Sequence, residues 1–171
     1  MNILFILDKD AKTGLSEDLK RQIMVNLEAK GHRFDVFELG KNDITQCLGC
    51  LLCLTKHAGE CTVKDTVNEI RKTVKKYDAT FFLTPILFGH YSSTIASPLN
   101  KGAGSHKWQV LLGYGEDLDE EEKNTFIDLI AKHRGKADIV HPRMDNQVDV
   151  FVSQSVEDNR KICESLKVSA G

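Results

Sequence analysis

Four of the five cysteines in this chain of 171 residues fall within one short segment, with the spacing Cys47-x2-Cys50-x2-Cys53-x7-Cys61. Three sulfurs at overlapping Cys-x-x-Cys spacings can occupy three corners of a cubane [4Fe-4S] cluster, while a fourth ligand comes from further along the chain. Thiolates are soft ligands, which excludes magnesium and calcium. We therefore interpret this segment first as an iron–sulfur site, with these four cysteines as the metal ligands.

Two other interpretations of the cysteines stay open. Zinc also accepts four cysteines, but commonly from two Cys-x-x-Cys pairs separated by a longer spacer, which this segment lacks. A redox dithiol uses two cysteines and leaves the other two unexplained. The segment could thus hold zinc, or carry vestigial or redox thiols. Cys163 stands alone in an expected helix, where a cysteine behaves as a small buried side chain.

A candidate phosphate site lies in residues 8–16, between the first expected strand and the first expected helix. The N–H groups and the dipole of a helix N-terminus attract an anion. Lys12 adds a cation, and Thr13 and Ser16 add hydroxyl donors. The segment is neither a P-loop nor a G-x-G-x-x-G turn. A plain N-cap, with Thr13 or Ser16 capping the helix, explains the same residues equally well.

A second candidate segment, residues 84–93, reads TPILFGHYSS. Pro85 fixes the backbone where the strand ends, and Gly89 allows another group to approach the backbone closely. Phe88 and Tyr91 offer flat apolar surfaces, against which a planar heterocycle could lie. The alternative is that Phe88 belongs to the core and Tyr91 to a solvated loop.

The elements that must position these segments follow from hydrophobic periodicity. Short apolar runs predict strands, and apolar residues at helical spacing predict helices. The expected strands are 3–7, 33–39, 79–84, 110–112 and one near 137–141, with 148–152 as a short, half-exposed extra strand. The expected helices are 15–27, 65–74, 119–134 and 156–167, and residues 86–105 are expected to be a loop with a weak helix inside.

This alternation of strands and helices predicts an α/β sandwich with a mainly parallel sheet. Right-handed crossovers bring the carboxyl ends of parallel strands to one edge, where ligands bind. The loops expected there are 8–15, 40–62, 85–92 and 113–118. One ligand could therefore touch the phosphate loop, the cysteine segment and the 84–93 segment.

The composition argues against some classes of binding partner. Twenty-three Lys and Arg against 25 Asp and Glu give a net charge of −2, which argues against nucleic acid or an anionic membrane as a partner. No stretch approaches the roughly 18 apolar residues of a membrane span. No secretory signal is visible at the start, so we expect a cytoplasmic location with reduced thiols. The length suits one domain, 1–171, with a cysteine-rich loop insertion at 44–63.

These motifs together resemble a known family. Cys47-Leu-Gly-Cys50, Cys53, Gly59-Glu-Cys61, Lys64-Asp65 and the 84–93 segment occur in the order and spacing of the flavodoxin-fold NADPH-dependent FMN reductases, and within them of the iron–sulfur flavoproteins. The resemblance implies a flavodoxin-like, doubly wound sandwich. Its five-stranded parallel sheet would have the order 2-1-3-4-5, with helices on both faces. Lys9 and Ala11 depart from the pattern, because a serine and an arginine are common there.

The resemblance also implies a cofactor and its contacts. FMN would be bound by a flavin-dependent oxidoreductase that exchanges electrons with NAD(P)H or a redox partner and forms a homo-oligomer. No acid–base catalyst is assigned; His90 is a candidate proton donor to the flavin, or a loop histidine bonded to backbone. The expected FMN-binding residues are Lys12, Thr13, Gly14 and Ser16 at the phosphate, Thr84, Pro85, Ile86, Leu87, Phe88, Gly89, His90 and Tyr91 at the ring, and Gly113, Tyr114 and Gly115 on its other side.

Two rival functions remain at this point. The first is an NAD(P)H-dependent FMN or quinone reductase whose cysteines bind no cluster. The second is a non-enzymatic flavodoxin-fold module that is bound to zinc or free of cofactor.

Overall fold

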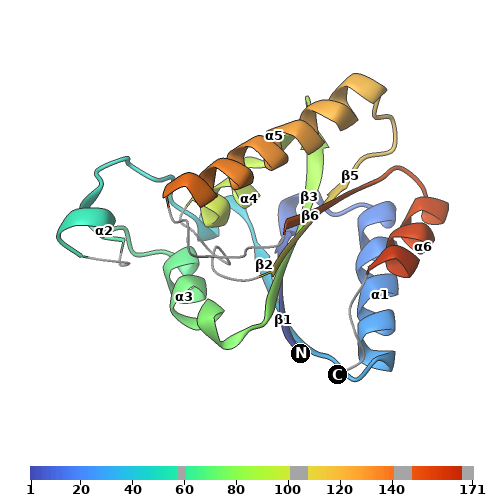
Figure 1. The fold of residues 1–171 in the computed structure, drawn as a ribbon, viewed down its shortest axis with the longest axis horizontal. Helices are drawn as coiled ribbons and strands as arrows, with labels where there is room; N and C mark the ends of the chain where they lie inside the picture. Colours follow the sequence, from blue (N-terminus) through green and yellow to red (C-terminus); the bar gives the residue numbers. More distant parts are fainter. Residues whose placement is uncertain (58–60, 101–107, 141–147, 167–171) are drawn as a thin grey trace.

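A parallel sheet runs through the centre of the molecule, with helices on both of its faces (Figure 1). The computed structural model describes residues 1–57, 61–100, 108–140 and 148–166. Over these residues the strand order is β2-β1-β3-β5-β6, and every neighbouring pair is parallel. The strands are β1 (Asn2–Asp8), β2 (Arg33–Leu39), β3 (Ala79–Leu87), β5 (Trp108–Tyr114) and β6 (Val148–Ser153). The predicted flavodoxin-like order is confirmed, because β4 is only a short hairpin partner of β3.

Two hydrophobic cores lie on opposite faces of the sheet. Because β1 is a central strand, its continuous apolar run 3–7 is buried on both faces. One core lies under α1 (Gly14–Ala29) and α6 (Val156–Ser165), and the other under α3 (Thr66–Thr73), α4 (Ser93–Asn100) and α5 (Glu120–Val140). The apolar repeat of α1 is buried as its spacing predicts, through Leu15, Leu19, Ile23 and Leu27.

Short elements complete the described chain at the loops. They are the 3-10 helices η1 (Lys9–Ala11), η2 (Lys41–Asp43) and η3 (Val74–Lys76), the short helix α2 (Leu52–Thr55) and the strand β4 (His90–Tyr91). The segment 86–105, expected to be mostly loop, instead contains the end of β3, β4 and α4. Figure 1 shows α2 on an arm that extends away from the sheet beyond α3.

One predicted strand was wrong, and another has a larger role in the sheet than expected. The strand expected near 137–141 is the end of helix α5, which runs to Val140, with residue 141 outside the described part. The fifth strand of the sheet is β6, which was expected to be only a half-exposed extra strand. An edge strand buries less of each side chain than a central one, and Val148, Val150 and Val152 are all half-buried.

Pro85 does not end β3, which continues to Leu87. The pairing of β3 with β1 ends at Leu83, so Pro85 has no ladder partner on that side. On its other side Pro85 still pairs in register with Tyr114. The missing N–H of a proline costs little where a strand has lost a neighbour, and for this reason proline did not mark the boundary.

No helix in the described residues has both the length and the apolar character that crossing a membrane requires.

Candidate functional site

The loop after β1 enters α1 through a capping box. Thr13 is the N-cap residue, and its Oγ1 accepts a hydrogen bond from the N–H of Ser16 at 3.2 Å. Ser16 returns the interaction, because its Oγ accepts from the N–H of Thr13 at 2.9 Å. Both hydroxyls thus satisfy the helix terminus, as the N-cap interpretation of this segment predicts.

Two amides at this helix terminus remain open to a ligand. Among the described residues, none accepts a hydrogen bond from the N–H of Gly14 or Leu15, the first two residues of α1. Space is also free here, since a Cβ added to Gly14 would meet nothing within 4 Å. Open N–H groups at the positive end of a helix are suited to binding an anion. The loop therefore keeps an anion-binding terminus, supplied by its backbone.

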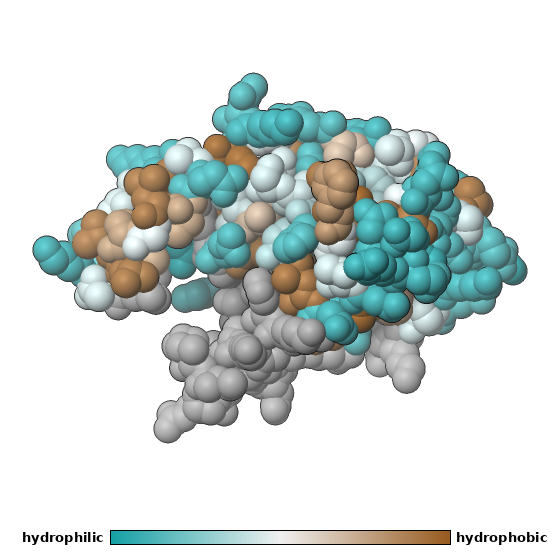
Figure 2. Space-filling view, turned by 90° about the horizontal axis from the view of Figure 1, so that it is seen from above, coloured by the Kyte–Doolittle hydropathy of each residue, from teal (hydrophilic) through white to brown (hydrophobic). Residues whose placement is uncertain are grey.

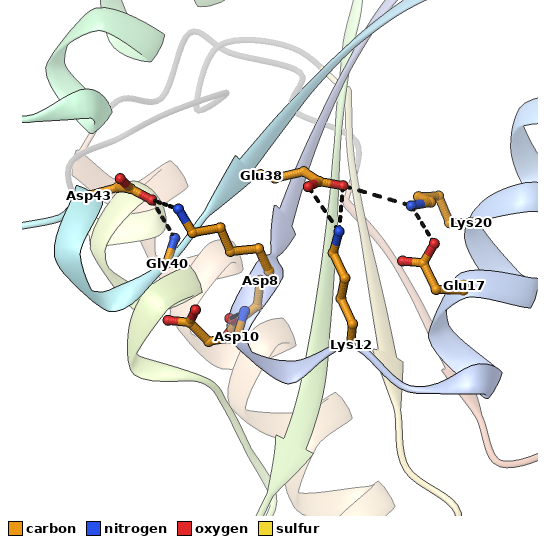
Figure 3. A network of polar contacts seen from close by, with 9 residues as sticks. Asp8, Asp10, Lys12, Glu17, Lys20, Glu38, Gly40 and Asp43 are labelled. Carbon is orange, nitrogen blue, oxygen red and sulfur yellow. Dashed lines mark hydrogen bonds and ion pairs between the residues drawn. The ribbon is translucent and has the colours of Figure 1, made fainter.

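Lys12 is held by a carboxylate from the neighbouring strand (Figure 3). Its Nζ lies 2.9 Å from both Oε1 and Oε2 of Glu38, which stands near the end of β2. The hydrogen bond to Lys12 lowers the pKa of Glu38, and the same bond raises the pKa of Lys12. Lys20 on α1 reaches both Glu38, at 3.8 Å, and Glu17, at 2.7 Å. The cation predicted to meet a phosphate thus already has an anionic partner.

Charged contacts also fasten the loop after β1 to the loop after β2. Lys9 Nζ lies 2.5 Å from Asp43 Oδ2, and the same oxygen accepts from the N–H of Gly40 at 2.9 Å. Asp10 Oδ2 accepts from the N–H of Lys41 at 2.7 Å. Figure 3 shows Asp43 and Gly40 of the second loop beside Asp10 of the first. The start of the 40–62 loop is thereby tied to the candidate phosphate loop.

Tyr114, at the end of β5, contacts the loop after β1. Its hydroxyl donates to the carbonyl oxygen of Ala11 at 2.6 Å, and its side chain is buried. Burial raises the pKa of Tyr114 to about 12, so the phenol stays protonated and keeps its role as donor. Gly113 is close-packed, because a Cβ there would lie 2.7 Å from Ile86 and Phe126 atoms. Tyr114 supports the loop, and Gly113 lets β5 pack closely.

The 84–91 segment forms a tight β-hairpin. Leu87 pairs with His90, and the two residues between them, Phe88 and Gly89, have φ of 51° and 74°. Positive φ at both central positions is the geometry of a type I′ turn. Phe88 is 91% exposed, so the alternative that placed it in the core is wrong. Tyr91 is half-buried and packs against the second core.

The hairpin has a fixed position on the molecule. The backbone of Gly89 lies directly on α5, where an added Cβ would come within 2.6 Å of the Thr125 side chain. At its base, the buried Thr84 Oγ1 accepts from the N–H of Ser92 at 2.9 Å. Leu87 and Phe88 are thereby presented to solvent from a rigid support, at the carboxyl end of β3. An exposed apolar surface of this kind can support a planar ligand.

The cysteine segment leaves the sheet at the same edge. Cys47 and Cys50 are exposed, Cys53 and Cys61 are half-buried, and none of the four is in a disulfide. The Sγ of Cys50 lies 4.0 Å from Thr62 Oγ1, which brings the two ends of the segment together. Within the described ranges, no three His, Cys, Asp or Glu side chains are gathered closely enough to hold a metal ion.

The backbone bends sharply on both sides of Cys50. Gly49 and Leu51 have φ of 65° and 56°, in the left-handed region that a leucine seldom adopts. Leu48 and Leu51 are exposed, and Figure 2 shows hydrophobic side chains gathered at the left end of the molecule, over the α2 arm. Cys163, in contrast, lies on the buried face of α6 as predicted, and burial raises its pKa to about 11.

Asp65 joins the two ends of the cysteine segment. It is the N-cap of α3, where Oδ1 accepts from the N–H of Asn68 at 3.1 Å, and Oδ2 accepts from the N–H of Thr45 at 2.9 Å. Asn68 in turn donates from Nδ2 to the carbonyl oxygen of Cys61 at 3.4 Å. Sequence reasoning noted Lys64-Asp65 only as a motif. The roles of Asp65 and Glu38 were missed, because each depends on a partner that only the folded chain brings near.

Together, the sheet order and the loops at its carboxyl edge define a flavodoxin-like α/β fold. Residues 1–109 match the NADPH-dependent FMN reductase family, which is more than half of the chain. The chain therefore belongs to this family, and the predicted resemblance is confirmed.

Curated relatives point to one branch of the family. An iron-sulfur flavoprotein of Methanocaldococcus jannaschii is 26% identical over 95 residues, which cover 56% of this chain and 48% of that protein. An iron-sulfur flavoprotein of Archaeoglobus fulgidus is 27% identical over 88 residues, covering 52% of this chain and 39% of that protein. The matches thus span less than half the length of these relatives.

Solved structures agree on the fold. An NAD(P)H:quinone oxidoreductase from Methanothermobacter marburgensis has a TM-score of 0.68, with 13% identity over 98% of this chain and 99% of that one. A flavodoxin from the domain Archaea has a TM-score of 0.52, with 10% identity over 96% of this chain and 92% of that one. At these identities the likeness concerns the fold alone.

Proposed function

We propose that this protein is an FMN-binding electron-transfer oxidoreductase that also holds a [4Fe-4S] cluster on Cys47, Cys50, Cys53 and Cys61. The observation that carries the proposal is the position of four disulfide-free cysteines, on a loop that leaves the sheet at the edge where the phosphate loop and the exposed hairpin lie. Iron–sulfur flavoproteins among the curated relatives support the same assignment.

The residues at the carboxyl edge fit FMN. The open amides of Gly14 and Leu15 would hold the phosphate, and Lys12 would add a positive charge. The exposed side chains of Leu87 and Phe88 would support the flavin ring, because α5 holds their hairpin in place. The end of β5 would support the site through Gly113, Tyr114 and Gly115. Tyr114 donates to the carbonyl oxygen of Ala11 and so fixes the loop after β1.

The cysteine segment fits a cluster through its donor set. Four thiols, two of them exposed, form a soft ligand set of the kind iron–sulfur clusters take. The backbone bends around Cys50, and the apolar Leu48 and Leu51 beside it would shield a bound cluster from water. The segment would close around the metal, since binding and folding of such sites are coupled. When bound, FMN would supply two-electron chemistry and the cluster one-electron transfer.

The remaining parts of the proposal concern partners and location. NAD(P)H or a protein redox partner would exchange electrons with the flavin, as the family name suggests for NADPH. The chain would form a homo-oligomer and work in the cytoplasm, away from nucleic acid and membranes. A net charge of −2 argues against either of those as a partner.

A second candidate function is a cluster-free NAD(P)H-dependent FMN or quinone reductase. The observation that favours it is that no group of three metal-ligating side chains is gathered in the part of the chain that the structure describes. In this case the protein would bind FMN, and its cysteines would remain thiols.

Metal and flavin analysis of protein prepared without oxygen tests the proposal. We expect FMN together with roughly four iron atoms and four sulfides per chain. Cys50→Ser should lose most of the iron and keep the FMN, whereas the matched control Cys163→Ser should keep both, because Cys163 is buried in the core on the inner face of α6. FMN without iron would favour the second candidate, and zinc or no cofactor would contradict both.

A further inference from the structure

We infer that Glu38 sets the preference of this protein between phosphorylated and unphosphorylated flavins, by competing with the flavin phosphate for Lys12. The inference rests on the proposed function, because it concerns the phosphate end of the flavin site. Glu38 acts as a specificity-determining residue, whose role is distinct from the family pattern of the loop.

The contact itself is well defined. Both carboxylate oxygens of Glu38 lie 2.9 Å from Lys12 Nζ, so the ammonium group faces the end of β2 (Figure 3). The parallel register places Glu38 opposite Leu7, one residue before the strand end where the loop after β1 begins. The sheet therefore delivers a carboxylate to this loop whatever ligand is bound. Lys12 can serve a phosphate only by sharing its charge with Glu38.

The loop has little else with which to attract a phosphate. The Ser16 hydroxyl donates to the carbonyl oxygen of Thr13, whereas the Thr13 hydroxyl accepts in the capping box and keeps its own O–H donor. Lys9 is paired with Asp43, and Ala11 stands where an arginine is common in the family. Within the described residues, a phosphate here would meet the Thr13 hydroxyl, the open amides of Gly14 and Leu15, and Lys12 as the nearest cation. Electrostatic attraction at this site thus depends on a single shared cation.

Charge at the loop is otherwise acidic. Figure 3 labels Asp8, Asp10, Glu17, Glu38 and Asp43 around Lys12 and Lys20, and Lys9 is paired with Asp43. A dianionic phosphate placed here is repelled by Glu38 as well as deprived of Lys12. Both effects act on FMN, and neither acts on riboflavin, which lacks the phosphate.

The pair can be opened at low cost. Lys12 and Glu38 are each 39% exposed, and an exposed ion pair contributes little to stability. A phosphate at the helix N-terminus can therefore draw Lys12 away, while Glu38 keeps Lys20 as a neighbour at 3.8 Å. The affinity for FMN therefore exceeds the affinity for riboflavin by less than it would if Lys12 had no carboxylate partner.

Equilibrium titration of the cofactor-depleted full chain with FMN and with riboflavin, followed by flavin fluorescence, tests this inference. We expect Glu38→Gln to tighten FMN binding about fivefold, the upper size for releasing a cation from an exposed ion pair. Riboflavin binding should change less than about twofold, because no phosphate is present. In a Lys12→Met background, the same Glu38→Gln change should give a much smaller gain for FMN.

A matched control separates the contact from overall charge. Glu69→Gln on α3 removes the same charge from an exposed residue paired with Lys72, and should leave both affinities unchanged. An equal gain for both flavins, a gain that persists fully with Lys12→Met, or no gain at all would overturn the inference while FMN binding itself stands. Failure of every variant to bind either flavin would overturn the proposed function and this inference with it.

Discussion

Asp18 shows how one carboxylate can join two helices. It lies on α1, and its Oδ2 accepts from Asn159 Nδ2 on α6 at 2.8 Å and from Gln22 Nε2 at 2.7 Å. Arg21 pairs with its other oxygen. The hydrogen bond from Asn159 lowers the pKa of Asp18, and those from Arg21 and Gln22 lower it further. Asn159 is itself fully buried and also bonds the carbonyl of Leu15.

This lowered pKa predicts a pH dependence of stability. A carboxyl group whose folded pKa lies below its unfolded value stabilises the fold at neutral pH, and this contribution is lost as the pH falls below about 4. Asp18→Asn should therefore cost about 1 kcal/mol at pH 7 and much less near pH 3. Urea unfolding of both proteins at the two pH values measures the difference. Equal cost at both pH values would show that the charge of Asp18 does not matter.

At the scale of elements, sequence periodicity was informative wherever burial was complete. The run 3–7 and the four-residue repeat of α1 are central and fully packed, and both were predicted correctly. β6 is an edge strand with half-buried side chains, and its pattern was too weak to identify it as part of the sheet. The end of α5 was mistaken for a strand because the only local signal in 137–141 is the β-branched pair Ile139-Val140, which periodicity cannot assign.

The sequence predicted which residues belong to the candidate site better than it predicted which partners they contact. The cysteine spacing and the hairpin residues Phe88 and Gly89 could be located from the sequence, because local motifs carry them. The partner of Lys12 could not, since Glu38 meets it only through the register of β1 with β2. The hydrogen bond from Tyr114 to Ala11 likewise joins residues far apart in the chain.

The N-cap of α3 makes a prediction about the cysteine segment. Asp65→Ala removes one cap interaction and the bond to the N–H of Thr45, so both ends of the segment lose an anchor. We expect a loss of about 1 kcal/mol in stability, and about tenfold weaker iron binding, as for other residues that position metal ligands. Iron retention against a chelator, measured beside thermal unfolding, gives both values.

Ser155→Ala is the matched control for Asp65→Ala. Ser155 caps α6 by accepting from the N–H of Asp158 at 3.1 Å. It lies far along the chain from the four cysteines of the 47–61 segment. Its loss should lower stability by a similar amount and leave iron binding unchanged. If both variants lost iron equally, the effect of Asp65 would be one of general stability, and its positioning role would be contradicted.

At the scale of the whole molecule, the sheet brings the segments of the two proposed cofactor sites to one edge. The loop after β1 and the loop that leads to the cysteines are linked by the Lys9–Asp43 and Asp10–Lys41 contacts. The hairpin at the end of β3 is held on α5. A flavin and a cluster bound at this edge would thus be supported by the same rigid framework, which is the arrangement that electron transfer between them requires.

The number of electrons the protein accepts tests this account most directly. Protein prepared without oxygen, with its FMN and iron content measured, would be reduced by controlled-potential coulometry while its absorption spectrum is followed. We predict roughly three electrons per chain, two for the flavin and one for the cluster. Uptake of only two electrons, all of them accompanied by bleaching of the flavin, would contradict the cluster, and uptake of none would contradict the redox function altogether.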